Sequence, residues 1–140
     1  MADECIFCRI VENRSMVPHW LAESDKALAF LDINPIRTGH TLVIPKAHAV
    51  DLRTITDGDW AAVAGLSARV VNLLRRKLGT TGENLFVASG PGSEQSVFHL
   101  HVHIIPRSPD DDLRWNDWWK TKAFTPPTAE LNALAKKIRS

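Results

Sequence analysis

Six histidines and two cysteines are the residues of this 140-residue chain best suited to chemistry. Three of the histidines, His99, His101 and His103, alternate with apolar residues over positions 98–105. If this segment is a strand, the alternation places the three imidazoles on one face, about 7 Å apart. Neighbouring imidazoles can share a reaction at phosphorus, because a neutral ring can attack the phosphorus atom and a protonated ring can neutralise charge on its oxygens.

A glycine-rich loop, residues 90–96, immediately precedes these histidines and supplies glycines, serine hydroxyls and backbone amides. Concave clusters of backbone amides bind anions, above all phosphate. Such a loop alone is weak evidence, but beside three facing histidines it favours a phosphate site. Two other interpretations of the histidines stay open: a polar face exposed to solvent, and a row that binds only a metal ion.

The two cysteines, Cys5 and Cys8, form a Cys-x-x-Cys motif near the start of the chain. A structural disulfide between them would close a very short loop and stabilise little. A thioredoxin-like redox pair needs a strand before the motif, and only four residues precede Cys5. The third interpretation is half of a zinc site, completed by ligands from elsewhere in the chain. The motif alone leaves these alternatives open.

The composition is that of an ordinary globular domain, with 44% hydrophobic residues and a formal net charge of +1. A near-neutral chain is poorly suited to bind nucleic acid or an anionic membrane through a broad charged surface. The sequence has no apolar run of the roughly 20 residues that span a bilayer, and its first residues do not predict a signal peptide. We therefore expect a cytoplasmic protein without nucleic-acid or membrane partners.

Hydrophobic periodicity predicts an α+β fold with one antiparallel sheet of about five strands and helices on one of its faces. The expected helices are a long one over residues 57–78, capped by Thr56 or Asp57 and ended by Gly79, and two short ones over residues 5–13 and after Pro126. Residues 110–125 have no clear period. The expected strands span residues 19–23, 27–31, 40–44, 84–88 and 96–105, the last with Phe98, Leu100, Val102 and Ile104 in the core.

Residues 95–105, Gln-Ser-Val-Phe-His-Leu-His-Val-His-Ile-Ile, resemble the signature of the histidine triad (HIT) superfamily, in which three histidines alternate with apolar residues. Residues 5–8, 32–35 and 39–48 also resemble the family, in the same order along the chain. The resemblance implies a single HIT domain over residues 1–140, with a core at 5–107 and a C-terminal segment at 108–140. It also implies a bacterial-type member that forms a homodimer.

The resemblance implies that the protein is a nucleotide hydrolase or nucleotidyl transferase, which cleaves at the α-phosphate through a nucleotidyl-histidine intermediate. The implied substrate is a small-molecule nucleotide, either a nucleoside phosphoramidate or a dinucleoside polyphosphate. His101 matches the nucleophile, and His103 matches the histidine that contacts the transferred phosphate. The other implied contacts are Ser96 and Gln95 at the phosphate and its leaving atom, Asp32 at the ribose hydroxyls, and Phe7, Ile10, Phe30 and Ile33 around the base.

The resemblance also implies a structural zinc ion, held by Cys5, Cys8, His48 and His99. Two thiolates and two imidazoles form a closed tetrahedral site of the structural kind. Taken without the family, Asp32 is a turn residue before Asn34-Pro35, and the four apolar residues assigned to the base pocket belong to the core.

Two positions depart from the family pattern. Ala88 stands where many members carry an asparagine that contacts substrate, and Glu94 stands where a glycine is common. An acidic side chain beside a phosphate site weakens anion binding unless it turns outward. These departures motivate an alternative function, a purine-nucleotide-binding regulatory protein with little activity.

Overall fold

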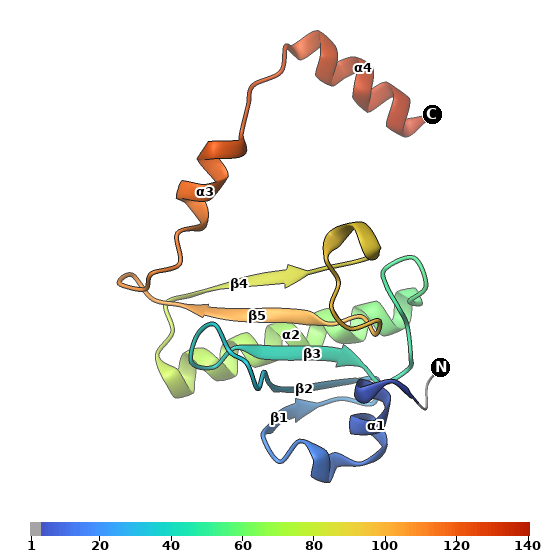
Figure 1. Cartoon of the computed structure of the whole chain (residues 1–140), viewed down its shortest axis with the longest axis vertical. Coiled ribbons are helices and arrows are strands. Elements are labelled where there is room, and N and C mark those ends of the chain that lie inside the picture. The colour runs from blue at the N-terminus through green and yellow to red at the C-terminus, as the bar shows by residue number, and fades with distance from the viewer. Residues whose placement is uncertain (1–3) are drawn as a thin grey trace. The chain divides into compact units, whose positions relative to one another are not determined.

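The computed structural model describes residues 4–140. The unit that ends at Pro109 is built on one antiparallel sheet in the strand order β1-β2-β3-β5-β4 (Figure 1). The strands are β1 (Trp20–Glu23), β2 (Ala27–Leu31), β3 (Thr41–Pro45), β4 (Gly82–Val87) and β5 (Val102–Arg107). The α-helices are α1 (Ile6–Glu12), α2 (Asp57–Leu78), α3 (Trp115–Lys122) and α4 (Thr128–Arg139), and two short 3₁₀ turns span Arg14–Met16 and Pro91–Ser93. Within residues 4–140, none of the helices has the length and apolar character needed to span a bilayer.

The long helix α2 has the bounds that its sequence signals predict. Its first turn is capped by the Thr56 hydroxyl, which accepts a hydrogen bond of 3.1 Å from the Asp59 amide. Its last turn ends at Gly79, whose left-handed conformation (φ 66°) suits a residue without a Cβ atom.

Helices cover both faces of the sheet, so the expectation that they share one face is wrong. Buried residues of α2 pack on Ala27, Ala29, Val43, Val102 and Ile104 of the sheet. On the opposite face, α1 contributes to a second core cluster that contains Phe7, Ile10, Val17, Leu28, Phe30, Leu42 and Ile44. The alternation of side chains along β2 and β3 supplies apolar residues to both clusters, which is why these strands are buried almost throughout.

The histidine-rich strand begins later than predicted, because β5 starts at Val102 and residues 96–101 are not a strand. Before this point the backbone bonds to a loop rather than to the sheet, and the Leu100 amide donates to the Ala49 carbonyl over 2.7 Å. Leu100, Val102 and Ile104 are buried as expected, but Phe98 is 57% exposed and does not belong to the core.

Residues 110–140 form a compact unit separate from the unit that ends at Pro109. This second unit contains α4, which the sequence predicts, and α3, which it does not. Within the described part of this unit, no residue of α3 or α4 is buried. α3 has only eight residues, about two turns, which is too short for an apolar pattern to repeat in the sequence.

Removing the α2 cap is expected to cost stability without disturbing the site. We expect Thr56→Ala to lower the free energy of unfolding by about 1 kcal/mol, because the Asp59 amide loses its acceptor. Chemical denaturation measures the change. Thr56→Ser, which keeps the hydroxyl, is the matched control, and equal losses in both variants would contradict the capping role.

Candidate functional site

The sheet face opposite α2 carries three polar side chains, Asp32, His40 and His103, at neighbouring positions. Leu42 of β3 pairs with His103 of β5, and side chains two residues apart share a face, so His40 lies on the same face as His103. At the end of the β2–β3 pair, the Asp32 amide donates to the His40 carbonyl over 2.9 Å. The sheet register, rather than closeness in sequence, therefore brings the three residues together.

A chain of polar contacts links these side chains. His40 Nε2 lies 2.9 Å from His103 Nδ1 and 3.5 Å from Asp32 Oδ2. The other carboxylate oxygen, Asp32 Oδ1, accepts a hydrogen bond of 2.8 Å from the Asn34 amide. His40 is almost fully buried, and Asp32 and His103 are half-buried, so the contacts are largely shielded from water.

His101 is buried beside this group, and its ring orientation is fixed by one backbone contact. Its Nδ1 donates to the carbonyl of His99 over 2.9 Å, so in the neutral ring Nε2 carries the lone pair. The His101 ring lies 4.9 Å from the ring of His103 and 5.4 Å from that of Phe7, measured between centroids. A neutral imidazole with one free nitrogen is the form that a nucleophile requires.

Burial sets the charge of the other two histidines. It lowers the pKa of His103 to about 4, aided by the neighbouring His101 and His40. It also lowers the pKa of His40, although Asp32 acts in the opposite direction. Both rings are therefore neutral near pH 7. His103 offers an N–H donor to a bound phosphate, not the positive charge of a protonated ring.

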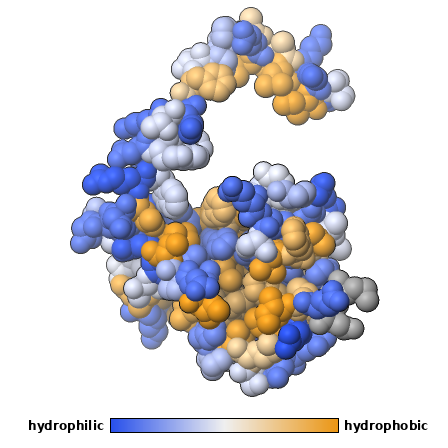
Figure 2. Space-filling view, viewed as in Figure 1, coloured by the Kyte–Doolittle hydropathy of each residue, from blue (hydrophilic) through white to orange (hydrophobic). Residues whose placement is uncertain are grey.

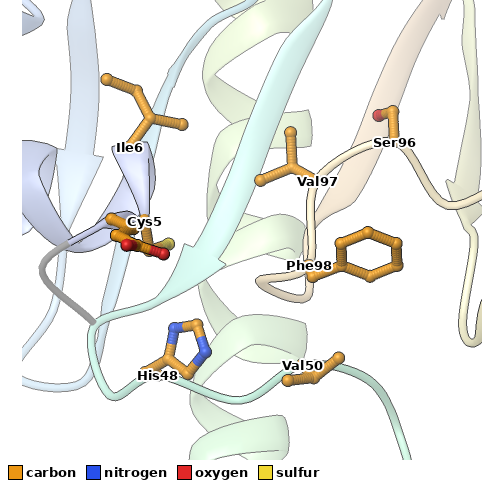
Figure 3. A pocket seen from close by; sticks show the side chains of 8 residues that line it. Cys5, Ile6, His48, Val50, Ser96, Val97 and Phe98 are labelled. Carbon is orange, nitrogen blue, oxygen red and sulfur yellow. The ribbon is translucent and has the colours of Figure 1, made fainter. Parts of the chain in front are cut away.

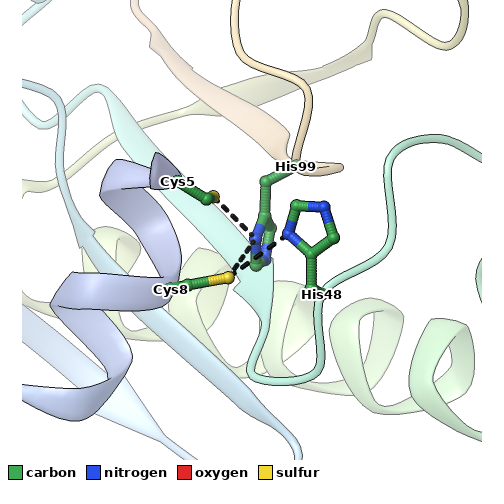
Figure 4. Close-up of side chains that lie close together, drawn as sticks. All are labelled: Cys5, Cys8, His48 and His99. Atoms are coloured by element: carbon green, nitrogen blue, oxygen red, sulfur yellow. Dashed lines mark hydrogen bonds between the residues drawn. The ribbon is translucent and has the colours of Figure 1, made fainter. Parts of the chain in front are cut away.

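Cys5, Cys8, His48 and His99 meet in one cluster, with one ligand atom from each lying within 4.8 Å of all the others (Figure 4). The sulfur of Cys8 lies 3.2 Å from His48 Nδ1 and 3.6 Å from His99 Nδ1, and the sulfur of Cys5 lies 3.4 Å from His99 Nδ1. The cluster joins α1, the loop after β3 and the segment before β5.

The chemistry of this cluster fits a tetrahedral zinc ion. His99 Nε2 donates to the Pro45 carbonyl over 2.8 Å, which leaves the lone pair on Nδ1, the nitrogen that faces both sulfurs. Burial and the neighbouring Cys5 raise the pKa of Cys8 to about 11. The thiolate is therefore disfavoured unless a cation lies beside it, and zinc would supply that cation.

The loop before the histidines is held together by the side chain of Gln95. Its oxygen accepts from the Gly90 amide over 2.9 Å, and its nitrogen donates to the carbonyls of Val50 (2.6 Å) and Val97 (3.0 Å). Both amide hydrogens are thus used within the protein. Gln95 has no donor left for a phosphate, and the structure gives it the role of shaping the loop.

Glu94, the residue before it, has a left-handed backbone (φ 60°), the conformation that glycine adopts without cost. This conformation gives a physical reason for the glycine that is common here in the family. The Glu94 side chain is exposed, as an outward-turned carboxylate should be. The second departure, Ala88, is buried and offers only a methyl group.

Ser96 lies at a shallow pocket of about 380 Å³ on the side of the Cys5–Cys8–His48–His99 cluster (Figure 3). The pocket is lined mainly by apolar residues, and neither His101 nor His103 is among them. Among the described residues, the Ser96 hydroxyl has no hydrogen-bond partner, so it is available to a ligand. The lining residues are Glu4, Cys5, Ile6, His48, Val50, Ser96, Val97 and Phe98.

The residues assigned to the base pocket divide into two groups. Phe7, Ile10 and Phe30 are buried and pack together, with the rings of Phe7 and Phe30 5.7 Å apart. Ile33 is 78% exposed instead. The unit that ends at Pro109 also exposes apolar side chains elsewhere, and Figure 2 shows hydrophobic residues grouped on its visible face.

The sequence alone assigns no role to His40, and the structure places its ring against that of His103. Its separation from His103 by more than 60 positions hides the contact, which appears only once the register of β3 and β5 is known. His40 and Leu42 lie two residues apart in one predicted strand, so their side chains share a face. This signal places His40 beside His103 only once the pairing of β3 with β5 is known.

Comparison with known proteins gives consistent matches. The family model described as "HIT domain" matches residues 14–110. An adenosine 5'-monophosphoramidase of Schizosaccharomyces pombe is 35% identical over 97% of this chain and 96% of its own. An adenylylsulfatase of Arabidopsis thaliana is 31% identical over 100% of this chain and 68% of its own. A zinc-bound histidine triad family protein from Mycobacterium smegmatis has a TM-score of 0.74 and 36% identity, covering 82% of this chain and 83% of that one.

Proposed function

The chain belongs to the HIT domain family, and from this premise we propose that it is a nucleotide hydrolase or nucleotidyl transferase that cleaves at an α-phosphate. The observation that carries the proposal is the orientation of His101, whose Nδ1–H is bonded to the His99 carbonyl and whose Nε2 is therefore a free nucleophile. In the proposed reaction, Nε2 attacks phosphorus and the leaving group departs with its electron pair. Water then releases the nucleotide from the histidine.

The relatives support the proposed substrate class. The similar proteins from S. pombe and A. thaliana are named for action on an adenosine phosphoramidate and an adenylyl sulfate, both of which carry a leaving group on the α-phosphate of an adenosine nucleotide. We place nucleoside phosphoramidates first and dinucleoside polyphosphates second. His103 contacts the transferred phosphate as a neutral donor, Ser96 offers its hydroxyl to the phosphate or its leaving atom, and Gln95 shapes the loop that carries them.

Asp32 would bind the ribose hydroxyls, since its half-buried carboxylate adjoins the His40–His103 pair. Phe7, Ile10 and Phe30 would form the floor of the base site, with Ile33 at its exposed rim.

The Cys5, Cys8, His48 and His99 cluster would hold a structural zinc ion, as a related solved structure is described as zinc-bound. Bound zinc would fix α1 to the segment before β5, because its ligands come from both. No protein ligand position would remain open for substrate, so zinc supplies no chemistry to the reaction.

The proposal is tested by a turnover panel. The purified protein is incubated with adenosine 5'-phosphoramidate, adenylyl sulfate and a dinucleoside polyphosphate, and released nucleotide is measured by chromatography. We expect turnover of at least one of them, with the phosphoramidate fastest. No turnover of any of the three would reject the enzymatic function.

A second candidate function rests on Ala88, whose buried methyl group replaces a polar substrate contact common in the family. In this alternative, the protein binds purine nucleotides as a regulator and turns them over little. Calorimetric titration with AMP and GMP separates the two: binding without turnover favours the regulator, whereas no binding of either nucleotide rejects it.

We also propose a homodimer. The strand order leaves β4 at one edge of the sheet, and Leu85 and Phe86 of this strand are more than half exposed. An exposed edge strand with apolar side chains is suited to pair with the same strand of a second copy. Sedimentation at micromolar concentration would identify the dimer by its mass.

Ribose recognition gives a prediction specific to Asp32. We expect Asp32→Asn to raise KM for a ribonucleotide substrate about 10-fold or more, because hydrogen bonds from sugar hydroxyls to a charged group contribute about 1.5–3 kcal/mol. The matched comparison is a 2',3'-dideoxy substrate, which should lose little further affinity in the variant. If the variant weakened both substrates equally, Asp32 would not be the ribose contact.

A further inference from the structure

The two cysteines of the cluster differ in how far they can be reached from outside. Cys5 is half-buried and lines the pocket beside Ser96, whereas Cys8 is 7% exposed and is not among the lining residues (Figure 3). Their sulfurs lie within 4.8 Å of each other. A small molecule that enters the pocket therefore meets Cys5 first, and a second sulfur lies close behind it.

The lining of the pocket favours a small molecule without negative charge. Four of its residues are apolar, namely Ile6, Val50, Val97 and Phe98. Among the described residues that line it, Glu4 carries the only carboxylate, and none is lysine or arginine. Apolar walls and a negative charge disfavour an anionic oxidant such as glutathione disulfide, whereas hydrogen peroxide is small and neutral.

We propose that Cys5 and Cys8 form a site of reversible oxidation by a neutral peroxide, at which formation of a disulfide releases the zinc ion. The zinc site is itself part of the proposal above. The effect of oxidation on turnover rests on the proposed function, but the oxidation of the cysteines does not.

The oxidation takes two steps. As zinc ligands both sulfurs are thiolates, the form that peroxide oxidises. Cys5 Sγ attacks a peroxide oxygen, so that an S–O bond forms, the O–O bond breaks and hydroxide leaves. Cys8 Sγ then attacks Cys5 Sγ, so that the S–S bond forms, the S–O bond breaks and a second hydroxide leaves. Two electrons pass from the sulfurs to the peroxide, and the hydroxides take protons from the solvent.

The disulfide cannot replace what the metal ion supplies. It contains no thiolate, so His48 and His99 would be the ligands left, and a structural zinc site needs four. A bridge across so short a loop also stabilises little, whereas bound zinc contributes its binding energy to folding. A dithiol reductant together with zinc should therefore restore the original state.

Phe7 connects this oxidation to the proposed active site. It lies between the two cysteines in the sequence, and its ring is 5.4 Å from that of His101 and 5.7 Å from that of Phe30, measured between centroids. A bond between the sulfurs constrains the backbone that carries Phe7, and loss of zinc frees α1 from His99. Oxidation thus acts on a ring that packs against the proposed nucleophile.

The primary test uses the wild-type protein as purified, with its zinc. Hydrogen peroxide is added, released zinc is measured with a chromogenic chelator, and the cysteines are mapped by alkylation and peptide mass spectrometry. A sample without peroxide gives the background. We expect about one zinc ion released for each Cys5–Cys8 disulfide formed. The chain has two cysteines, so each modified peptide is assigned directly.

The order of reaction is read with a trap for sulfenic acid. At early times we expect the trap to label Cys5 at least about 10-fold more than Cys8, since susceptibility follows exposure. Cys8→Ser and Cys5→Ser are a matched pair, because each lacks one zinc ligand and keeps one sulfur. Cys8→Ser should accumulate sulfenic acid at Cys5, and Cys5→Ser should be oxidised about 10-fold more slowly.

Reversal separates the switch from general damage. Treating the oxidised wild type with a dithiol reductant and zinc should restore both zinc content and turnover. Oxidised methionine would persist, because its repair needs an enzyme. A loss of turnover that remains after zinc has returned would overturn the switch.

Each other outcome rejects a definite statement. Protein purified without zinc, and unable to take it up, would overturn this proposal together with the metal site. Zinc that stays bound while peroxide is present would overturn the oxidation site alone. Earlier labelling of Cys8 would reject Cys5 as the attacking sulfur. The expected disulfide and zinc release, in a protein that turns over none of the panel substrates, would reject the proposed function and leave the oxidation site intact.

Discussion

Replacing His101 by asparagine is expected to lower turnover by about 10⁴-fold or more, the scale of losing a nucleophile. Asparagine can still donate to the His99 carbonyl from the place of Nδ1, so the local backbone contact survives. It has no nitrogen at the place of Nε2, so the phosphorus of the substrate has no attacking group. The loss should fall on kcat rather than on nucleotide affinity.

Three measurements check this expectation. Initial rates with the preferred substrate give kcat, calorimetry with AMP gives affinity, and rapid acid-free quenching followed by mass spectrometry detects nucleotide on the protein. The adduct should appear in the wild type and be absent from His101→Asn. His19→Asn is the matched control, because His19 takes part in neither histidine cluster. A variant at position 101 that keeps more than a tenth of the rate would show that another residue attacks.

Of the substitutions considered, one that disrupts the Cys5–Cys8–His48–His99 cluster should have the largest effect on stability. We expect Cys8→Ser to remove bound zinc and to lower the free energy of unfolding by at least about 3 kcal/mol, since the binding energy of a structural zinc is folding energy. For a domain of this size, that loss lowers Tm by about 10 °C or more. A buried serine beside three remaining ligands cannot restore the thiolate charge.

A chelator provides an internal control for the Cys8→Ser experiment. Zinc content is measured by atomic emission on freshly purified protein, with about one ion per chain expected in the wild type. Thermal unfolding is then followed with and without a strong chelator. The chelator should destabilise the wild type to the level of Cys8→Ser and leave the variant unchanged. Equal zinc content in both proteins would remove Cys8 from the ligand set.

The sequence predicts the parts of this fold that carry local signals. The bounds of α2 follow from a capping threonine, acidic residues in the first turn and a glycine after the last turn, all within one segment. The hairpin of β1 and β2 is equally local, and its strands lie within a residue of the predicted ones. The family resemblance adds the four zinc-type ligands, which the structure brings together.

The wrong predictions lie where a sequence pattern continues although the backbone conformation changes. Residues 98–105 alternate without interruption, yet only the part from Val102 onward pairs with other strands. The segment before it bonds to the loop near Ala49 and is shaped by Gln95, and neither contact is visible in the alternation. The same alternation predicts that Phe98 lies in the core, and this prediction is wrong because Phe98 is exposed.

Other features depend on contacts between distant segments. The choice of face for α1 rests on Phe7 and Ile10 meeting β2 and β3, and an amphipathic pattern does not say which face of a sheet it will cover. The partner of His40 depends on strand register. The strain at Glu94 depends on its left-handed backbone angle, which a glutamate in the sequence does not predict.

His99 belongs to both halves of the site. Its ring faces the cysteine sulfurs through Nδ1, while its own carbonyl accepts the hydrogen bond that orients His101. With zinc bound at the cluster, the chains that hold zinc would therefore be the chains that are catalytically competent. A partly stripped preparation would behave as a mixture of competent and idle chains: its specific activity would track its zinc content in direct proportion, with KM unchanged. Rates for this protein would then have a defined meaning only per mole of bound metal.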